Sequence, residues 1–141
     1  MEVDKIITDE KILRQISEKA TEDQIKELDL INRLKKSNAT AWTPGCGLAA
    51  IQIGIPLRVA WYTYEKNEEV LFNPEIITKI GHVSIKEGCL SIPDKWTEVS
   101  RAYNIEYINN GKKKKAKGMR ARIIQHEIDH MNGILNIDKG I

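Results

Sequence analysis

The sequence MRARIIQHEIDHMNG, residues 119–133, decides how this chain folds. Its apolar residues and two histidines follow the period of an α-helix, and Asn132-Gly133 is typical of a helix end. The segment therefore predicts a late helix, which we expect to be buried. His126 and His130 are four residues apart, so they lie on one face of this helix, one turn apart.

His126, Glu127 and His130 form an H-E-x-x-H motif. Two imidazoles at this spacing can bind one metal ion, and the intervening glutamate lies where it can act as a general base. An ordinary polar patch is the alternative, but two of the chain's 3 histidines fall here. Asp129 is either a solvated charge or a partner that orients a histidine or a neighbouring loop.

We expect the third metal ligand upstream, because Asp138 is the only acidic residue or histidine after His130. The segment Glu87-Gly88-Cys89-Leu90-Ser91 offers one, since a thiolate is a strong ligand for borderline metals. A His₂Cys set leaves a fourth position open for water, as a catalytic site requires. The Leu90 backbone N–H could point at a substrate oxygen. The alternative for Cys89 is a small buried apolar residue.

A glycine-rich segment, GCGLAAIQIG at residues 45–54, is the third candidate site. Its glycines permit tight turns and close backbone approach, and Gln52 offers an amide that could stabilise an oxyanion. A packing corner with a surface glutamine is the alternative. The segment lacks the residues of a P-loop and the spacing of a dinucleotide fingerprint. Cys46 has no evident base, so we interpret it as lining a pocket.

Local patterns predict the remaining secondary structure. Thr21 and Gln24 have the spacing of a capping box, and apolar residues then recur every three positions, which predicts a helix from about Glu22 to Lys36. Asn109-Asn110-Gly111 predicts a hairpin turn, and strands joined by short turns favour antiparallel pairing. β-Branched and aromatic residues predict strands at Arg58–Tyr64, Val70–Phe72, Glu75–Ile80 and Asn104–Ile108.

The length favours a single domain over residues 1–141, and the predicted elements make it α+β, with antiparallel sheets around the buried late helix and a helix near the N-terminus. The chain is 41% hydrophobic and 30% charged, which is ordinary for a globular protein. Its net charge of +2 is too small to indicate DNA or a membrane as a partner. No apolar run approaches the ~18 residues that span a bilayer, and the charged N-terminus lacks the apolar run of a signal peptide. We therefore expect a cytoplasmic protein, and a monomer. The lysine run Lys112–Lys117 is either a solvated loop or a contact with ribosomal RNA.

Together the three candidate segments resemble the peptide deformylase family. Gly-x-Gly-Leu-Ala-Ala-x-Gln-x-Gly, Glu-Gly-Cys-Leu-Ser and Gln-His-Glu-x-Asp-His follow one another in the family's order, and the similarity covers roughly Gly45 to Gly133. The resemblance implies a metal-dependent hydrolase that removes the N-formyl group from the formyl-methionine of new polypeptides and releases formate. Many members continue beyond the position where this sequence ends. Short forms similar to this one are encoded by some bacteriophages, so the resemblance implies a bacterial or phage protein.

The resemblance also implies the metal and its ligands. Cys89, His126 and His130 match the family's metal ligands, and Glu127 matches its general acid/base. The metal is typically Fe²⁺, while Zn²⁺, Ni²⁺ or Co²⁺ can occupy the same site.

Other residues match positions that act on the substrate. Gln52 and the Leu90 N–H match the pair that stabilises the developing oxyanion, and Gly47 matches a backbone contact with the substrate. The positions that match the surroundings of the methionine pocket are Cys46, Ile85, Glu87, Met119, Arg122 and Ile123.

Two functions of other classes remain open. One is a metalloprotease that cleaves internal peptide bonds, against which the cysteine ligand and the narrow approach past Gly47 argue. The other is a metal-binding module without catalysis, against which the intact Glu127 and Gln52 argue.

Overall fold

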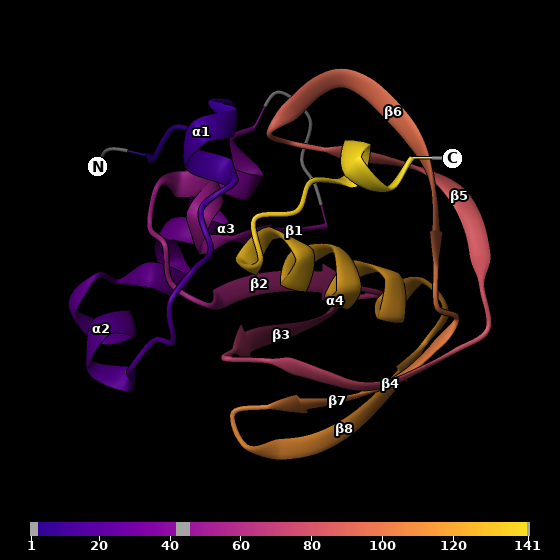
Figure 1. Ribbon diagram of the computed structural model, residues 1–141. Helices are drawn as coiled ribbons and strands as arrows, with labels where there is room; N and C mark the ends of the chain where they lie inside the picture. Colours follow the sequence, from indigo (N-terminus) through magenta and orange to yellow (C-terminus); the bar gives the residue numbers. More distant parts are fainter. Residues whose placement is uncertain (1–2, 42–45, 141) are drawn as a thin grey trace.

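The computed structural model describes residues 3–41 and 46–140, so Gly45 of the glycine-rich segment lies outside the described residues. Helix α4 (Gly118–Met131) runs through the centre of the molecule (Figure 1). Ten of its residues are buried, which confirms the expected buried helix. Asn132 caps it, and Gly133 follows at φ 72°, a conformation that glycine adopts easily.

Antiparallel strands surround this helix, as predicted. One sheet has the order β1-β2-β3, a second has the order β4-β7-β8, and β5 and β6 form a two-stranded sheet. The strands are β1 (Gly47–Ala49), β2 (Val59–Tyr64), β3 (Asn67–Phe72), β4 (Glu75–Ile80), β5 (Val83–Cys89), β6 (Ile92–Arg101), β7 (Asn104–Asn109) and β8 (Lys112–Lys117). The four predicted strands thus correspond to β2, β3, β4 and β7.

The predicted single helix from Glu22 to Lys36 is wrong. The chain forms α2 (Glu22–Glu27) and α3 (Leu30–Ala39), separated by Asp29 in the left-handed conformation at φ 49°. The capping box of Thr21 and Gln24 is confirmed at the start of α2. The break redirects the chain, so that Leu30 and Leu34 become fully buried, whereas α2 buries none of its residues.

The lysine run is also not a loop. It forms β8, which pairs with β7 from Asn109↔Lys112 to Asn104↔Lys117. The reason is the turn before it, where Asn110 and Gly111 have φ 51° and 77° and return the chain antiparallel.

The core lies on both faces of the first sheet. Successive residues of β2 point to opposite faces, so Ala60 and Tyr62 pack with the α4 side, whereas Val59 and Trp61 pack with the α3 side. The short helices α1 (Glu10–Leu13), η1 (Ala50–Ile53) and η2 (Asn136–Lys139) complete the structure. Over the described part of the chain, no helix combines the length and apolar character needed to cross a membrane.

Candidate metal centre

Helix α4 and the end of β5 bring three potential metal ligands together. Cys89 Sγ lies 3.4 Å from His130 Nε2, and that nitrogen lies 3.2 Å from His126 Nε2. All three ligand atoms are within 4.8 Å of one another. A tetrahedral ion with metal–ligand bonds of about 2.05 Å to nitrogen and about 2.3 Å to sulfur separates two nitrogens by about 3.3 Å, and nitrogen from sulfur by about 3.6 Å. The donor set therefore has the spacing of a single metal site.

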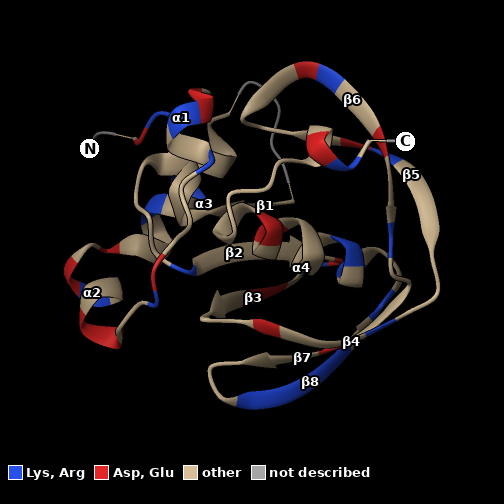
Figure 2. Cartoon of the chain, viewed as in Figure 1, with Lys and Arg blue, Asp and Glu red and all other residues tan. Residues whose placement is uncertain are grey.

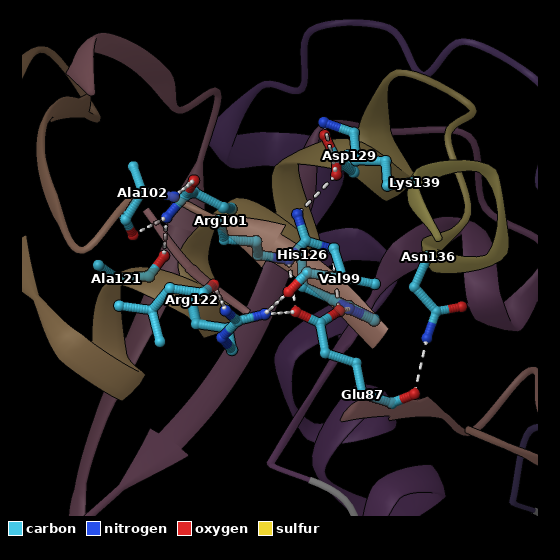
Figure 3. Close-up of polar contacts among 12 residues, drawn as sticks. Glu87, Val99, Arg101, Ala102, Ala121, Arg122, His126, Asp129, Asn136 and Lys139 are labelled. Carbon is cyan, nitrogen blue, oxygen red and sulfur yellow. Dashed lines mark hydrogen bonds and ion pairs between the residues drawn. The ribbon is translucent and has the colours of Figure 1, made fainter. Parts of the chain in front are cut away.

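Glu87 orients one of these ligands (Figure 3). Its Oε1 lies 3.0 Å from His126 Nδ1, so the ring's other nitrogen, Nε2, is directed at Cys89 and His130. Arg101 binds the same carboxylate through two hydrogen bonds of 2.6 and 3.0 Å, and Arg122 adds a further contact. Burial alone would raise the pKa of Glu87, but the hydrogen bonds from His126 and Arg101 lower it well below its ordinary value. The carboxylate therefore stays ionised behind the histidine.

Asp129 takes part in the same buried cluster, and the side-chain partners seen for it in the described chain are Arg101 and Lys139. Its carboxylate accepts a 2.8 Å hydrogen bond from Arg101 Nη1 and lies 3.4 Å from Lys139 Nζ. Asp129 therefore holds Arg101, which in turn holds Glu87. Asp129 is therefore not a solvated charge. It supports the ligand histidine indirectly, through Arg101 and Glu87.

The charges of His130 and Glu127 suit a cation site with an adjacent base. Burial, together with the neighbouring His126, lowers the pKa of His130 well below its ordinary value, so its imidazole is neutral and able to coordinate. Burial raises the pKa of Glu127 to about 7. Glu127 Oε1 is buried and has no hydrogen-bond partner among the described residues. A carboxylate with these properties can take up and return a proton near neutral pH.

Gln52 lies on the other side of Cys89. Its Nε2 donates to Ser91 Oγ at 3.0 Å and is 3.7 Å from Cys89 Sγ, while its Oε1 accepts from the Ala49 backbone N–H at 3.0 Å. The accepting side of the amide is thus fixed by the backbone, so its donating side is directed at Ser91 and the potential metal ligand Cys89. This arrangement rules out the alternative of a surface glutamine, since Gln52 is 2% exposed.

A pocket of about 340 Å³ opens beside the ligands and collects the residues that the sequence predicted. The polar ends of Glu87 and Arg122 are turned away into the buried ion cluster, where Arg122 also donates to the Val99 carbonyl at 3.1 Å. The predicted residues that line the pocket are Cys46, Gly47, Gln52, Ile85, Glu87, Cys89, Leu90, Met119, Arg122, Ile123, His126 and Glu127. His130 closes the site from behind, at 1% exposure.

Two residues of the site had no role in the prediction from sequence. Arg101 is buried and binds both Glu87 and Asp129, but no spacing within the sequence connects it to either. Trp96 lines the pocket although it is 65% exposed. Its only sequence signal is a large aromatic residue soon after the cysteine segment.

Two imidazoles on one helix, a thiolate from a distant hairpin and a buried carboxylate at an open pocket define a metal-dependent hydrolase. Comparison with known proteins gives the family. The family model described as Polypeptide deformylase matches residues 3–140. The peptide deformylase of Dictyoglomus thermophilum is 41% identical over 127 residues, which are 85% of this chain and 79% of that protein.

Two solved structures agree with this result. A probable peptide deformylase from Synechococcus phage S-SSM7 superposes with a TM-score of 0.83 at 38% identity, covering 96% of this chain and 97% of that one. A class I type b peptide deformylase from Acinetobacter baumannii, solved with Met-Ala-Ser bound, gives 0.88 at 28% identity and covers 98% of each chain. The chain belongs to the peptide deformylase family. Its Cys/His/His site is typical of that family.

Proposed function

We propose that this peptide deformylase removes the N-formyl group from the N-terminal formyl-methionine of newly made polypeptides, with Cys89, His126 and His130 holding one divalent metal ion. The observation that carries the proposal is the position of Glu127. This carboxylate lines the pocket beside the three ligand atoms, is buried, and has an oxygen free of partners among the described residues.

Fe²⁺ is the native metal in this proposal, and Zn²⁺, Ni²⁺ or Co²⁺ can replace it. One thiolate and two imidazoles suit divalent ions of borderline softness. When bound, the ion would supply Lewis acidity, which makes a water molecule more acidic and polarises the formyl oxygen.

The chain's own residues then move the protons and stabilise the charge. Glu127 takes a proton from the attacking water and later delivers it to the nitrogen of the leaving amine, as formate departs. The amide of Gln52 and the backbone N–H of Leu90 donate hydrogen bonds to the formyl oxygen as its negative charge develops. The 3.0 Å bond from Ala49 N–H to Gln52 Oε1 supports this role, because it holds the amide in the donating orientation.

The pocket suits a methionine side chain. Ile85, Met119 and Ile123 supply apolar wall, and the exposed Cys46 lies at the same pocket. Gly47 also lines the pocket, and only glycine fits there, since a Cβ at this position would lie 2.7 Å from both Trp61 O and Tyr62 Cβ of the paired strand β2. The peptide Met-Ala-Ser bound to the A. baumannii relative also begins with methionine.

Replacement of Glu127 by glutamine tests this proposal. Glutamine keeps the size of the side chain but cannot accept the proton, so formate release from formyl-Met peptides should fall by about 10²–10⁴ while the metal content stays the same. Glu98→Gln on the exposed face of β6 is the control and should leave both unchanged. Full activity in Glu127→Gln would show that another group is the base. Cleavage of blocked internal peptides by the wild type would instead favour a protease.

We further propose that the protein is a cytoplasmic monomer that touches ribosomal RNA through Lys112–Lys117. Figure 2 shows β8 as basic along most of its length, and Ala116 is the one residue of the strand that is not lysine. Lys113 and Lys114 pair with Glu106 and Glu69, so the triple variant Lys112→Ala, Lys115→Ala, Lys117→Ala removes lysines for which no such pair is seen in the described chain. This variant should sediment less with ribosomes at low salt. Equal sedimentation of the triple variant and the wild type would argue that these lysines only contact solvent at the edge of the sheet.

A further inference from the structure

Trp96 is an aromatic residue that the proposed mechanism does not use. It lies on β6, lines the pocket of the metal centre and is 65% exposed. Leaving so large an apolar ring in water is unfavourable, so an exposed ring beside a binding pocket indicates a contact made with a ligand.

The ring is held in place by Gly88. A Cβ at Gly88 would lie 3.0 Å from Trp96 Cη2 and Cζ3, and 3.2 Å from Cζ2. Three nearly equal distances mean that the six-membered ring lies with one face over Gly88, where any side chain would displace it. The register between β5 and β6 shifts at this point, between the pairs Glu87↔Thr97 and Cys89↔Ile92. One face of Trp96 is therefore packed, and much of the remaining ring is left to solvent.

The ring lies beside the proposed reacting centre. It packs over Gly88, which is bonded to the metal ligand Cys89, and all three residues line one pocket. A peptide with its formyl group at the ligands and its methionine in the pocket must continue across the rim. An extended chain advances about 3.3 Å per residue, which brings the first or second residue after methionine to the ring.

We propose that Trp96 is a specificity residue that binds an apolar or aromatic side chain one or two places after the formyl-methionine. This inference rests on the proposed function. The open ring face offers stacking and apolar contact to such a side chain, whereas a small polar side chain gains little from it. The neighbouring rim residues Asp94 and Lys95 carry opposite charges, so they select for neither sign.

Peptide selectivity tests the inference. The substrates are formyl-Met-Ser-Ser, formyl-Met-Phe-Ser and formyl-Met-Ser-Phe, each assayed for kcat/KM with the metal-loaded enzyme. We expect the wild type to prefer one of the phenylalanine peptides by about tenfold, the size of one aromatic contact. Trp96→Ala should reduce this preference to less than about threefold, and Trp96→Phe should keep most of it. Ile80→Ala is the control, because Ile80 is also 65% exposed but does not line this pocket.

Two other outcomes would overturn the inference. A wild type that does not discriminate among the three peptides has no apolar subsite at the rim. A Trp96→Ala variant that loses rate equally on all three peptides shows that the ring only supports the hairpin. Failure of the wild type to deformylate any of them would count against the proposed function instead, so the two failures are distinguishable.

Discussion

At the scale of single residues, Glu87 connects the metal ligands to the rest of the protein. Its side chain is 6% exposed and that of Arg101 is 3% exposed, yet the two form a bidentate pair next to His126. The family resemblance placed Glu87 around the methionine pocket. The residue does line that pocket, but its carboxylate contacts His126. Arg101 was not predictable as its partner, because 14 residues and a strand reversal separate the two positions.

Glu87→Gln should therefore weaken metal binding by about 10–100-fold, the usual effect of losing a group that orients a ligand histidine. It should also lower the free energy of unfolding by about 3 kcal/mol, since it leaves buried Arg122 without its counter-charge and Arg101 with Asp129 alone. Chelator competition and urea denaturation measure the two effects. Glu98→Gln, on the exposed side of β6, serves again as the matched control. Unchanged metal affinity in Glu87→Gln would mean that His126 needs no orientation by this carboxylate.

At the scale of elements, the helices and strands with a clear residue pattern were predicted correctly, and those that depend on a turn or on local backbone geometry were not. The late helix carries strong apolar periodicity, the four predicted strands are rich in β-branched and aromatic residues, and all of them are present. Strand β6 is mostly exposed, and β5 buries only Glu87 and Cys89, so neither has a run of buried apolar residues to mark it. The lysine-rich β8 is a strand only because the Asn110-Gly111 turn pairs it with β7. The helix break at Asp29 had no signal, since Asp29 is left-handed at φ 49° without a glycine or proline to mark the break.

Gly111 allows the turn to be tested alone. A Cβ added there would meet nothing within 4 Å, but the residue has φ 77°, which side-chain-bearing residues adopt at a cost of about 1–2 kcal/mol. Gly111→Ala should therefore lower the free energy of unfolding by about 1 kcal/mol without creating a clash. Asn110→Gly, at φ 51°, should be neutral or slightly stabilising. Thermal unfolding measures both variants. A Gly111→Ala variant as stable as the wild type would contradict the assigned turn conformation.

At the scale of the whole molecule, Glu69 joins the two larger sheets and helix α4. From β3 it accepts hydrogen bonds from Tyr62 of β2 at 2.5 Å and from Tyr107 of β7 at 3.0 Å. Lys114 of β8 donates to it at 2.9 Å and Arg120 of α4 at 3.3 Å. Burial alone would raise the pKa of Glu69, but the hydrogen bonds, led by those from Tyr62 and Lys114, lower it to about 2. The charged carboxylate is thus stabilised by folding.

This network makes stability depend on pH. Because the pKa of Glu69 is lower in the folded chain than in the unfolded one, its contribution is fully present above about pH 5 and is lost as the pH falls towards 2. Glu69→Gln should be about 2–3 kcal/mol less stable at pH 7 and should lose less further stability between pH 5 and pH 3. Urea denaturation at these pH values measures both. Glu106→Gln, which breaks the more exposed pair with Lys113, should change stability by less than about 1 kcal/mol. Parallel acid curves for Glu69→Gln and the wild type would refute the role of Glu69.

The central claim is that one thiolate and two imidazoles, from elements far apart in the sequence, hold a single metal ion. X-ray absorption at the metal edge of anaerobically purified protein tests this directly. We expect one metal per chain, with one sulfur neighbour at about 2.3 Å and the remaining neighbours nitrogen or oxygen at about 2.0–2.2 Å. The sulfur neighbour should disappear in Cys89→Ser. A wild-type spectrum without sulfur, or one that Cys89→Ser leaves unaltered, would contradict the account.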